Sequence, residues 1–425
     1  MAKKKQQAAE LPLVAIDLGS SGVRAMSASR VGADMLHILA VEQSNKFPCT
    51  ERGVVVQSSN AGFMIGEVLR LMANRLQLPD LPTAFVVLGG RSMQIVPVFS
   101  KRDLVHKREI PQRLLEEMEE ECKTKIETHN PGVAVLGLVP AYFKLDGVEQ
   151  EEAPVLTQRA ELVEAHYVAF VAHKEVETQI QKSFDQAGKS IEKTFVRPEA
   201  LLSAFVASDG LEILQQGCAV LDMGAQTTTL SVFKGTEYLY NKVVPQGGYH
   251  ITRVLEQSGI SLTMAEKLKC QFGYASPAQV EKNLKLKVPA SPDVVEGGIL
   301  HISSEELSRT IFIKLEEILK PLFEALNSFG DRIRTLYITG GASMLQGMQD
   351  YLQQKTTLQV IYGSHDTLVD DTTDPEFLEP RYSALVGALI LGADYRDEHR
   401  NLPVKAPGIF ERLQRQTEII FTDQS

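Results

Sequence analysis

One short pattern occurs twice in this chain, and the repetition restricts the possible folds more than any other feature. Residues 13–23 (LVAIDLGSSGV) and 218–232 (CAVLDMGAQTTTLSV) each contain an apolar strand, an aspartate, a glycine turn, hydroxyl side chains and a return strand. The N–H groups of such a turn suit phosphate oxygens, and the aspartate can hold Mg2+ through water. A single hairpin of this kind is usually only a hairpin. Two in matching context predict a duplicated, two-lobed α/β protein with a nucleotide between the lobes.

Composition narrows the class of protein. A chain of 425 residues and 47.0 kDa has room for several domains, and 44% hydrophobic with 23% charged residues is typical of a globular protein. A formal net charge of −10 argues against nucleic acid as the main partner. The four cysteines are scattered without CxxC spacing, which indicates reduced cytosolic thiols. The apolar run 384–393 is too short to span a bilayer, so we expect a cytoplasmic body.

Apolar periodicity predicts the elements around the two hairpins. Two antiparallel meanders are expected, at 13–18, 23–31 and 35–43, and at 219–222, 228–233 and 237–244. A helix capped by Ser58, Ser59 or Asn60 should bury Ile65, Val68, Leu69, Met72 and Leu76 before a strand at 84–89. A long helix is expected at 304–328, and a strand at 335–339 should lead through glycines into a helix from Met344.

Residues 90–173 have a different pattern and predict a small α/β insert. Strands are expected at 95–99, 133–139, 142–145 and 166–172, and a charged helix at 111–128. Five glutamates between 116 and 121 are predicted to form a solvated helix face, because carboxylates at adjacent helical positions point in different directions.

Two further helices are rich in small residues, at 200–207 and 383–393. Small residues allow two helices to approach closely, as an interlobe hinge requires, and ordinary core packing is an equal alternative. On a helix beginning at Thr263, Glu266 and Lys269 share one face and are candidates for contacts with a nucleoside.

Taken in order, these motifs resemble the actin, chaperone and sugar-kinase ATPase superfamily over nearly the whole chain. Within it, the passage V-P-Q-G-G-Y-H-I-T (244–252), then A-E-K-L-K-C-Q-F-G, and the position of the insert are similar to the FtsA family of bacterial cell-division proteins. The resemblance implies a two-lobed actin-like (ribonuclease-H-like) α/β fold, with an inserted subdomain in the first lobe and a C-terminal amphipathic helix.

Carried over by position, the resemblance implies an ATP site between the hairpins. Asp17 and Asp222 would hold water-coordinated Mg2+, while Glu266 and Lys269 would meet the nucleoside, with Gly340 and Gly341 behind the adenosine. The residues expected around the phosphates are Gly19, Ser20, Ser21, Gly224, Gln226, Thr227 and Thr228. The chain departs from the family at Ala225-Gln226, where glycines are common, and at Thr229, where an acid is common. We therefore expect ATP binding with slow hydrolysis at most.

The implied function is a scaffold that polymerises on the inner leaflet of the cell membrane at the division site. It would tether the tubulin-like FtsZ through that protein's C-terminal peptide and meet other division proteins. A pilus-assembly actin-like ATP-binding protein is one alternative. An actin-fold ATPase or kinase acting on a small substrate is another, although we can nominate no base for a kinase.

The expected division of the chain follows from these motifs. It comprises a disordered arm (1–10), the first-lobe core (11–89), the insert (90–173), further first-lobe core with a hinge helix (174–216), the second-lobe core (217–251), an upper subdomain (252–303), further second-lobe core (304–395), a linker (396–407) and a tail (408–425).

The tail has the spacing of an amphipathic helix. Ile409, Phe410, Leu413, Ile420 and Phe421 fall on one face and are predicted to bind the membrane. Glu411 and Glu418 offset Arg412 and Arg415, so burial of apolar side chains should dominate. The alternative is a helix that packs on the body of the protein.

Overall fold

The computed structural model describes residues 11–31, 35–150, 155–156, 158–210, 212–235, 237–291, 298–370 and 373–400. The predicted arm (1–10), the tail and most of the predicted linker lie outside these residues. Among the described helices, none is both long and apolar enough to cross a membrane.

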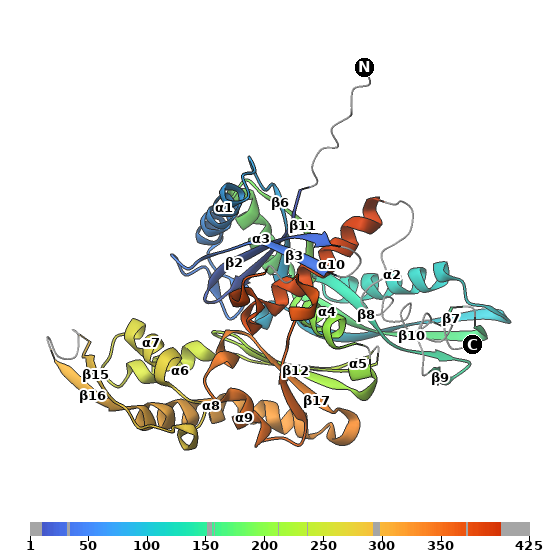
Figure 1. Cartoon of the computed structure of the whole chain (residues 1–425). Helices are drawn as coiled ribbons and strands as arrows, with labels where there is room; N and C mark the ends of the chain where they lie inside the picture. The colour runs from blue at the N-terminus through green and yellow to red at the C-terminus, as the bar shows by residue number, and fades with distance from the viewer. Residues whose placement is uncertain are drawn as a thin grey trace.

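Two five-stranded sheets with the same strand order form the two lobes (Figure 1). The first runs β3 (Met35–Ser44), β2 (Gly22–Val31), β1 (Leu13–Gly19), β6 (Thr83–Leu88) and β11 (Ser190–Val196). The second runs β14 (Glu237–Val244), β13 (Thr228–Lys234), β12 (Cys218–Met223), β17 (Thr335–Thr339) and β18 (Gln359–Tyr362). In each, three strands form an antiparallel meander, a fourth strand pairs in parallel with the first strand of that meander, and a fifth pairs in parallel with the fourth. Both predicted meanders are confirmed.

Helices α1 (Ser58–Arg75) and α3 (Lys174–Gln186) pack together beside the first sheet. Ile65, Val68, Leu69 and Met72 are fully buried on α1, as their spacing predicts. The expected side-chain cap is wrong, because the N-cap is Gln57 and makes no capping hydrogen bond. Two short strands, β4 (Thr50–Glu51) and β5 (Val54–Val55), form a hairpin before α1.

In the second lobe, α8 (Ser304–Asn327) begins with a capping box in which Ser303 and Glu306 bond each other's backbone. The upper part contains α6 (Gly248–Glu256), α7 (Leu262–Phe272), β15 (Lys285–Pro289) and β16 (Ile299–Ser303). The helix expected from Met344 is α9 (Met348–Gln353) instead. A 3₁₀ turn occupies Gly341–Met344, and Gly347, with φ of 73°, reverses the chain before α9.

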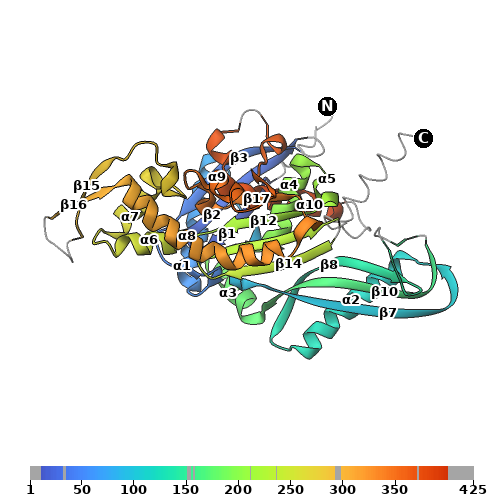
Figure 2. The ribbon, with the colours of Figure 1, turned by 90° about the horizontal axis from the view of Figure 1, so that it is seen from below.

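The insert is a sheet with strand order β7 (Gln94–Glu109), β10 (Arg159–His173), β8 (Val133–Leu145), β9 (Val148–Gln150), covered by α2 (Gln112–His129). The strands expected at 133–139 and 142–145 are one strand, because a register shift beside Ala141 lets β8 continue past Pro140. Figure 2 shows β8 beside β14 of the second lobe, and Phe170 meets Tyr238 edge-on, with 5.2 Å between ring centroids.

The glutamates of α2 pair with neighbouring cations, as a solvated face predicts. Glu117 pairs with Arg113 at 2.9 Å, and Glu121 with Lys125 at 2.6 Å. Across the described part of the chain, no group of three or more His, Cys, Asp or Glu side chains is placed to hold a metal ion.

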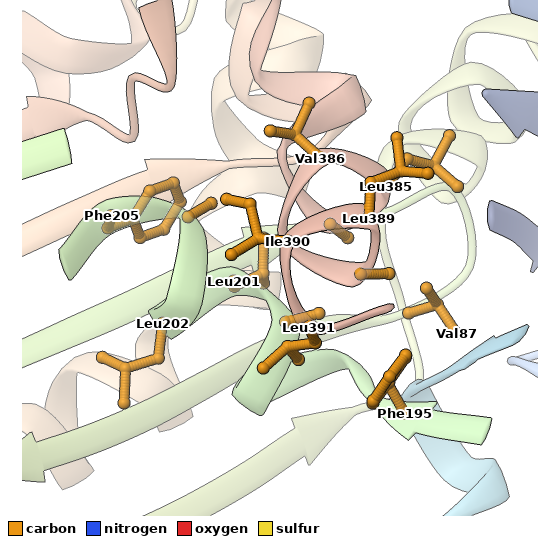
Figure 3. Close-up of a cluster of buried hydrophobic side chains, with 14 of the residues drawn as sticks. Val87, Phe195, Leu201, Leu202, Phe205, Leu385, Val386, Leu389, Ile390 and Leu391 are labelled. Carbon is orange, nitrogen blue, oxygen red and sulfur yellow. The ribbon is translucent and has the colours of Figure 1, made fainter. Parts of the chain in front are cut away.

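Helices α4 (Arg197–Asp209) and α10 (Ser383–Arg400) pack together between the lobes (Figure 3). Their apolar residues share one core with both sheets and with Phe170 of the insert. A Cβ on Gly387 would lie 1.7 Å from the carbonyl oxygen of Ala200, so the helices meet at backbone contact. The small residues therefore allow the two helices to approach closely, which is one of the two alternatives that the sequence offered.

Helix α10 is longer than expected. It ends at Arg400, so residues 396–400, predicted as linker, are helical. The guanidinium of Arg396 donates to both carboxylate oxygens of Glu192 at 2.7 Å and lies over the ring of Phe85. These contacts hold the additional helical turns against the first lobe. A short helix, α5 (Glu212–Gln216), follows α4.

The α4–α10 contact generates a stability prediction. Replacing Gly387 by alanine forces the helices apart and should lower the free energy of unfolding by about 1–3 kcal/mol, the usual cost of overpacking. The matched control is Gly66→Ala on α1, where the new Cβ would have its nearest neighbour at 3.8 Å. Helix propensity should make the control neutral or stabilising by about 0.5–1 kcal/mol. Urea denaturation measures the free energy of unfolding of both variants. Equal changes in the two would contradict the assigned helix contact.

Candidate functional site

The candidate site lies where parallel strands of both sheets end. Asp17 is on β1, Asp222 is on β12, and Arg197 follows β11 as the first residue of α4. Arg197 Nη2 donates to Asp17 Oδ1, and its Nε lies 3.7 Å from Asp222 Oδ2. Carboxyl ends of parallel strands are the usual ligand position in α/β proteins. The structure thus joins the aspartates of both hairpins through one side chain.

The first hairpin turn is held by a neighbouring segment. Thr50 Oγ1 donates to the Gly19 carbonyl at 2.6 Å, and the Gly53 N–H donates to Ser20 Oγ at 3.3 Å. Arg24 donates to Ser21 Oγ at 3.0 Å. Gly19 and Ser20 of the first loop are therefore bonded to the β4–β5 hairpin, while Ser21 is bonded to Arg24.

The second hairpin turn packs against the start of α6. The carbonyl of Gly224 accepts from the Gly248 N–H at 3.0 Å, and that of Ala225 accepts from the Tyr249 N–H at 2.7 Å. A Cβ on Gly247 would lie 2.3 Å from the Gly224 oxygen, so only glycine permits this approach. The turn therefore has a defined position relative to the upper subdomain.

The side chains of the second loop point in different directions. Gln226 Oε1 accepts from the Arg52 N–H at 2.9 Å, which links the second lobe to the first. Thr227 lies beside Gly90, whose Cβ position would be 3.2 Å from its hydroxyl. Thr228 is fully buried, and its hydroxyl donates to the Gln246 carbonyl at 2.9 Å, away from the turn. The Thr228 hydroxyl, which was predicted to contact phosphate, therefore already donates its hydrogen bond within the protein.

Arg52 and Gly53 bridge both loops, and the sequence analysis missed them. They form the turn between β4 and β5 with positive φ values of 54° and 87°. Gly53 is bonded to the first loop and Arg52 to the second. The R-G pair between two short β-branched segments was the available turn signal.

Charges at the centre of the site are strongly coupled. Burial alone lowers the pKa of Arg197, but Asp17 and Asp222 outweigh it and raise that pKa. Burial raises the pKa of Asp222; Arg197 opposes this and Asp17 adds to it. Arg24 Nη1 lies 4.0 Å from the other oxygen of Asp17.

The two carboxylates are the groups that would have to hold the Mg2+ implied by the resemblance. Mg2+ takes oxygen ligands in a near-ideal octahedron and usually keeps several waters. Here the two carboxylates already share a guanidinium, so a metal between them would have to displace Arg197 or lie against it. The residues present therefore do not fit a metal held between Asp17 and Asp222 while Arg197 keeps this position.

Glu266 and Lys269 are on α7 and lie against the start of α6, close to the second loop. Lys269 is 8% exposed, and its Nζ donates to Gly248 O at 3.1 Å, Thr252 Oγ1 at 2.9 Å and Glu266 Oε2 at 2.8 Å. Burial by itself raises the pKa of Glu266, but Lys269 and Thr252 outweigh it and lower that pKa. The ammonium is fully bonded within the protein, while half of the Glu266 side chain is exposed.

Gly340 and Gly341 follow β17, and the turn that they form lies beside Asp222 and the start of α6. Gly340 has φ of 85°, and a Cβ there would lie 2.6 Å from Asp222 Oδ1. Gly341 faces open space, with nothing within 4 Å of its Cβ position. The next residue, Ala342, would be 3.0 Å from a Cβ on Gly248. These contacts bring four parts of the second lobe together: the second loop, the start of α6, Lys269 and the Gly340-Gly341 turn.

Comparison with solved structures identifies the fold. The fold matches a PilM-PilN type IV pilus biogenesis complex with a TM-score of 0.64 at 17% identity, covering 90% of this chain and 98% of that chain. It matches MreB 5 of Spiroplasma citri bound to AMPPNP with a TM-score of 0.52 at 15% identity, covering 93% and 99%. The protein has an actin-like α/β fold, as predicted.

Sequence comparison gives the nearer relationship. The family model "Cell division protein FtsA" matches residues 219–387, from β12 to α10. Cell division protein FtsA of Rhizobium meliloti is 28% identical over 222 residues, covering 51% of this chain and 49% of that protein. FtsA of Streptococcus pneumoniae is 23% identical over 335 residues, covering 78% and 69%. The chain thus spans about half to two thirds of these relatives' lengths. The expected resemblance to the FtsA family is confirmed, and the chain is an actin-like relative of this cell-division protein.

The bonding of Lys269 generates a prediction. Lys269→Met leaves the Gly248 carbonyl, the Thr252 hydroxyl and the Glu266 carboxylate without their shared donor. We expect the free energy of unfolding to fall by about 1–3 kcal/mol. Lys267→Met, an exposed position on the same helix, should change it by less than about 0.5 kcal/mol. Guanidinium denaturation measures both, and a neutral Lys269→Met would contradict the buried role.

Proposed function

We propose that this protein binds ATP between its lobes and works as an actin-like scaffold of cell division. On this proposal it assembles into filaments on the cell membrane and tethers the tubulin-like FtsZ ring. The observation that carries the proposal is the meeting of both aspartate hairpins and the Gly340-Gly341 turn at one place, in a chain related to FtsA.

The proposed ATP site uses the groups that this convergence brings together. The turns at Gly19–Ser21 and Gly224–Thr227 would offer backbone N–H groups and hydroxyls to the phosphates. The half-exposed carboxylate of Glu266 would accept from ribose hydroxyls. The open face of Gly341 would lie against the adenosine. The fully bonded Lys269 would support Glu266 rather than contact the nucleotide.

Hydrolysis is proposed to be slow or absent. A general base must be available to orient and deprotonate the attacking water. Asp17 and Asp222 lie against Arg197, and Glu266 is paired with Lys269 at 2.8 Å. At the position opposite Asp222 in the hairpin, the residue is Thr229, which is buried and has no charge. ATP would therefore act as a structural ligand and not as a rapidly consumed substrate.

The open space at Gly341 provides a direct test of nucleotide binding. Gly341→Leu should fold, because nothing lies within 4 Å of the new Cβ, and the side chain should obstruct the adenosine. We expect ATP affinity to fall at least tenfold, measured by isothermal titration calorimetry. The control is Gly132→Leu in the insert, which also faces open space and should bind ATP normally. Equal ATP binding by all three proteins would contradict the assigned site.

Filament contacts are proposed to join the insert of one copy to the second lobe of the next, with the FtsZ C-terminal peptide bound at residues 259–301. A head-to-tail contact of this kind produces open filaments. Exposed apolar side chains occur on both surfaces, at Phe99 of β7 (53% exposed) and Ile299 of β16 (64%).

These exposed residues give the filament prediction. Phe99→Asp or Ile299→Asp should abolish filaments on a lipid layer with ATP, as seen by electron microscopy, because each places a charge in an apolar contact. Phe63→Asp on α1, 55% exposed and in the first lobe outside the insert, should still polymerise. Normal filaments from both test variants would exclude this geometry.

The membrane anchor is proposed to be the tail at residues 408–425, which lies outside the described residues. Partial burial of Ile409, Phe410, Leu413, Ile420 and Phe421 could contribute roughly 5 kcal/mol at about 25 cal/mol per Å2. That would be a weak anchor for one copy and a strong one for a filament, whose tails act together.

The tail prediction separates apolar burial from charge. Phe410→Glu, or deletion from Gly408 onward, should abolish liposome co-sedimentation while ATP binding persists. Gln416→Glu adds the same charge to the polar face and should leave most lipid binding intact. Full lipid binding by the deleted protein would show that the tail is not the anchor.

A further inference from the structure

Three elements place one cation between two acids at the centre of the site. Asp17 comes from the first lobe, Asp222 from the second, and Arg197 from the first residue of the helix between them. Side-chain exposure is only 18% for Arg197, 6% for Asp17 and 12% for Asp222. The guanidinium is therefore a mostly buried part of the site, not a surface group that happens to lie nearby.

The backbone around this ion-pair cluster is shaped to admit it. A Cβ on Gly89, at the end of β6, would lie 2.8 Å from both Cδ and Nε of Arg197. A Cβ on Gly340, at the end of β17, would lie 2.6 Å from Asp222 Oδ1. Any other residue at either glycine would push the arginine or the carboxylate away. The two glycines thus leave room for the guanidinium and for the Asp222 carboxylate in their present positions.

Two arginine side chains already supply the positive charge that a metal ion would otherwise bring to Asp17 and Asp222. Two carboxylates face Arg197, and Arg24 lies 4.0 Å from Asp17, so the four side chains sum to no net charge. A divalent cation added here would lie against a guanidinium in a partly dry site, where repulsion between like charges is strong. The described residues also place no third acid, histidine or cysteine to complete a metal site.

An arginine side chain can bind the phosphate groups that a Mg2+ ion would otherwise bind. A guanidinium has five N–H donors, and its planar fork matches phosphate oxygens. The contacts to Asp17 and Asp222 use Nη2 and Nε, and they leave the donors of Nη1 for another acceptor.

We propose that Arg197 is the built-in cation of this site, in the place of Mg2+, so that the phosphates of a nucleotide bind without a divalent metal. The nucleotide part rests on the proposed function. The cation part concerns Asp17, Asp222 and Arg197 alone and can be tested without nucleotide.

The first experiment measures binding of a fluorescent ATP analogue to the full chain in excess MgCl2 and in EDTA. The wild-type Kd should agree within about threefold between the two conditions. Arg197→Gln should bind at least tenfold more weakly in EDTA and recover with Mg2+, because its freed carboxylates can hold the metal. Arg197→Lys keeps the charge and should retain most binding in EDTA.

The second experiment measures thermal unfolding without nucleotide, with and without Mg2+ or Mn2+. The wild-type Tm should not respond to either metal. Arg197→Gln should have a lower Tm that metal raises again, since it leaves Asp222 without a counter-ion and Asp17 with only Arg24 at 4.0 Å. The matched control is Arg396→Gln, which breaks the part-buried pair with Glu192 and should lower the Tm without metal rescue.

The outcomes separate the two proposals. ATP binding by the wild type that falls tenfold or more in EDTA would overturn the role of Arg197 and leave nucleotide binding intact. Absence of ATP binding in both conditions would overturn the proposed ATP site. The Tm measurements would then still show whether Arg197 is the cation of this site. A metal-dependent rise in the wild-type Tm that Asp222→Asn removes would overturn the built-in cation. If Arg197→Gln does not fold, the wild-type measurements decide.

Discussion

The backbone contact between α4 and α10 is the constraint on which the rest of the structure depends. Helix α10 packs against the first sheet, α4 contacts strands of both sheets, and Gly387 meets the Ala200 carbonyl with no room for one methyl group. Because close-packed interiors deform little, this contact fixes how the two sheets face each other. The carboxyl ends of their parallel strands then meet at one place, and Arg197, the first residue of α4, lies between them.

That arrangement couples the electrostatics of the site to the packing of the lobes. Arg197 contacts an aspartate from each lobe, and Gln226 bonds the backbone of Arg52 across the same boundary. Any separation of the lobes would leave buried carboxylates without their cation, which is costly in a region of low polarity. Movement of the lobes and the charge of the site should therefore change together, and a bound phosphate would act on both.

The relationship to FtsA and the actin-like fold describe a class of protein, while the site describes this chain. Its second loop carries Gln226 and Thr229, and its central cation is a side chain. Under the proposed function, these features favour a nucleotide that holds a conformation over one that is rapidly consumed.

Much of the fold followed from local pattern. The duplicated hairpins, both meanders and the long helix α8 depend on apolar periodicity and turn residues, which act over a few neighbours along the chain. Elements set by longer contacts were harder to predict. Strand β8 continues past Pro140 because β10 accommodates the bulge, and α10 continues to Arg400 because Glu192 binds Arg396.

The site divides in the same way. The sequence by itself determined that two aspartate hairpins, a Glu266–Lys269 pair and a glycine turn after a strand exist, because each is a short continuous motif. Only the tertiary structure decided what they contact. It buried Thr228 and Lys269, brought in Arg52 from a hairpin in the first lobe, and placed Arg197 between Asp17 and Asp222. The physical reason is that a motif specifies the conformation of its own backbone, whereas the counter-ion of a buried charge is supplied by whichever distant element the packing of the lobes brings within reach.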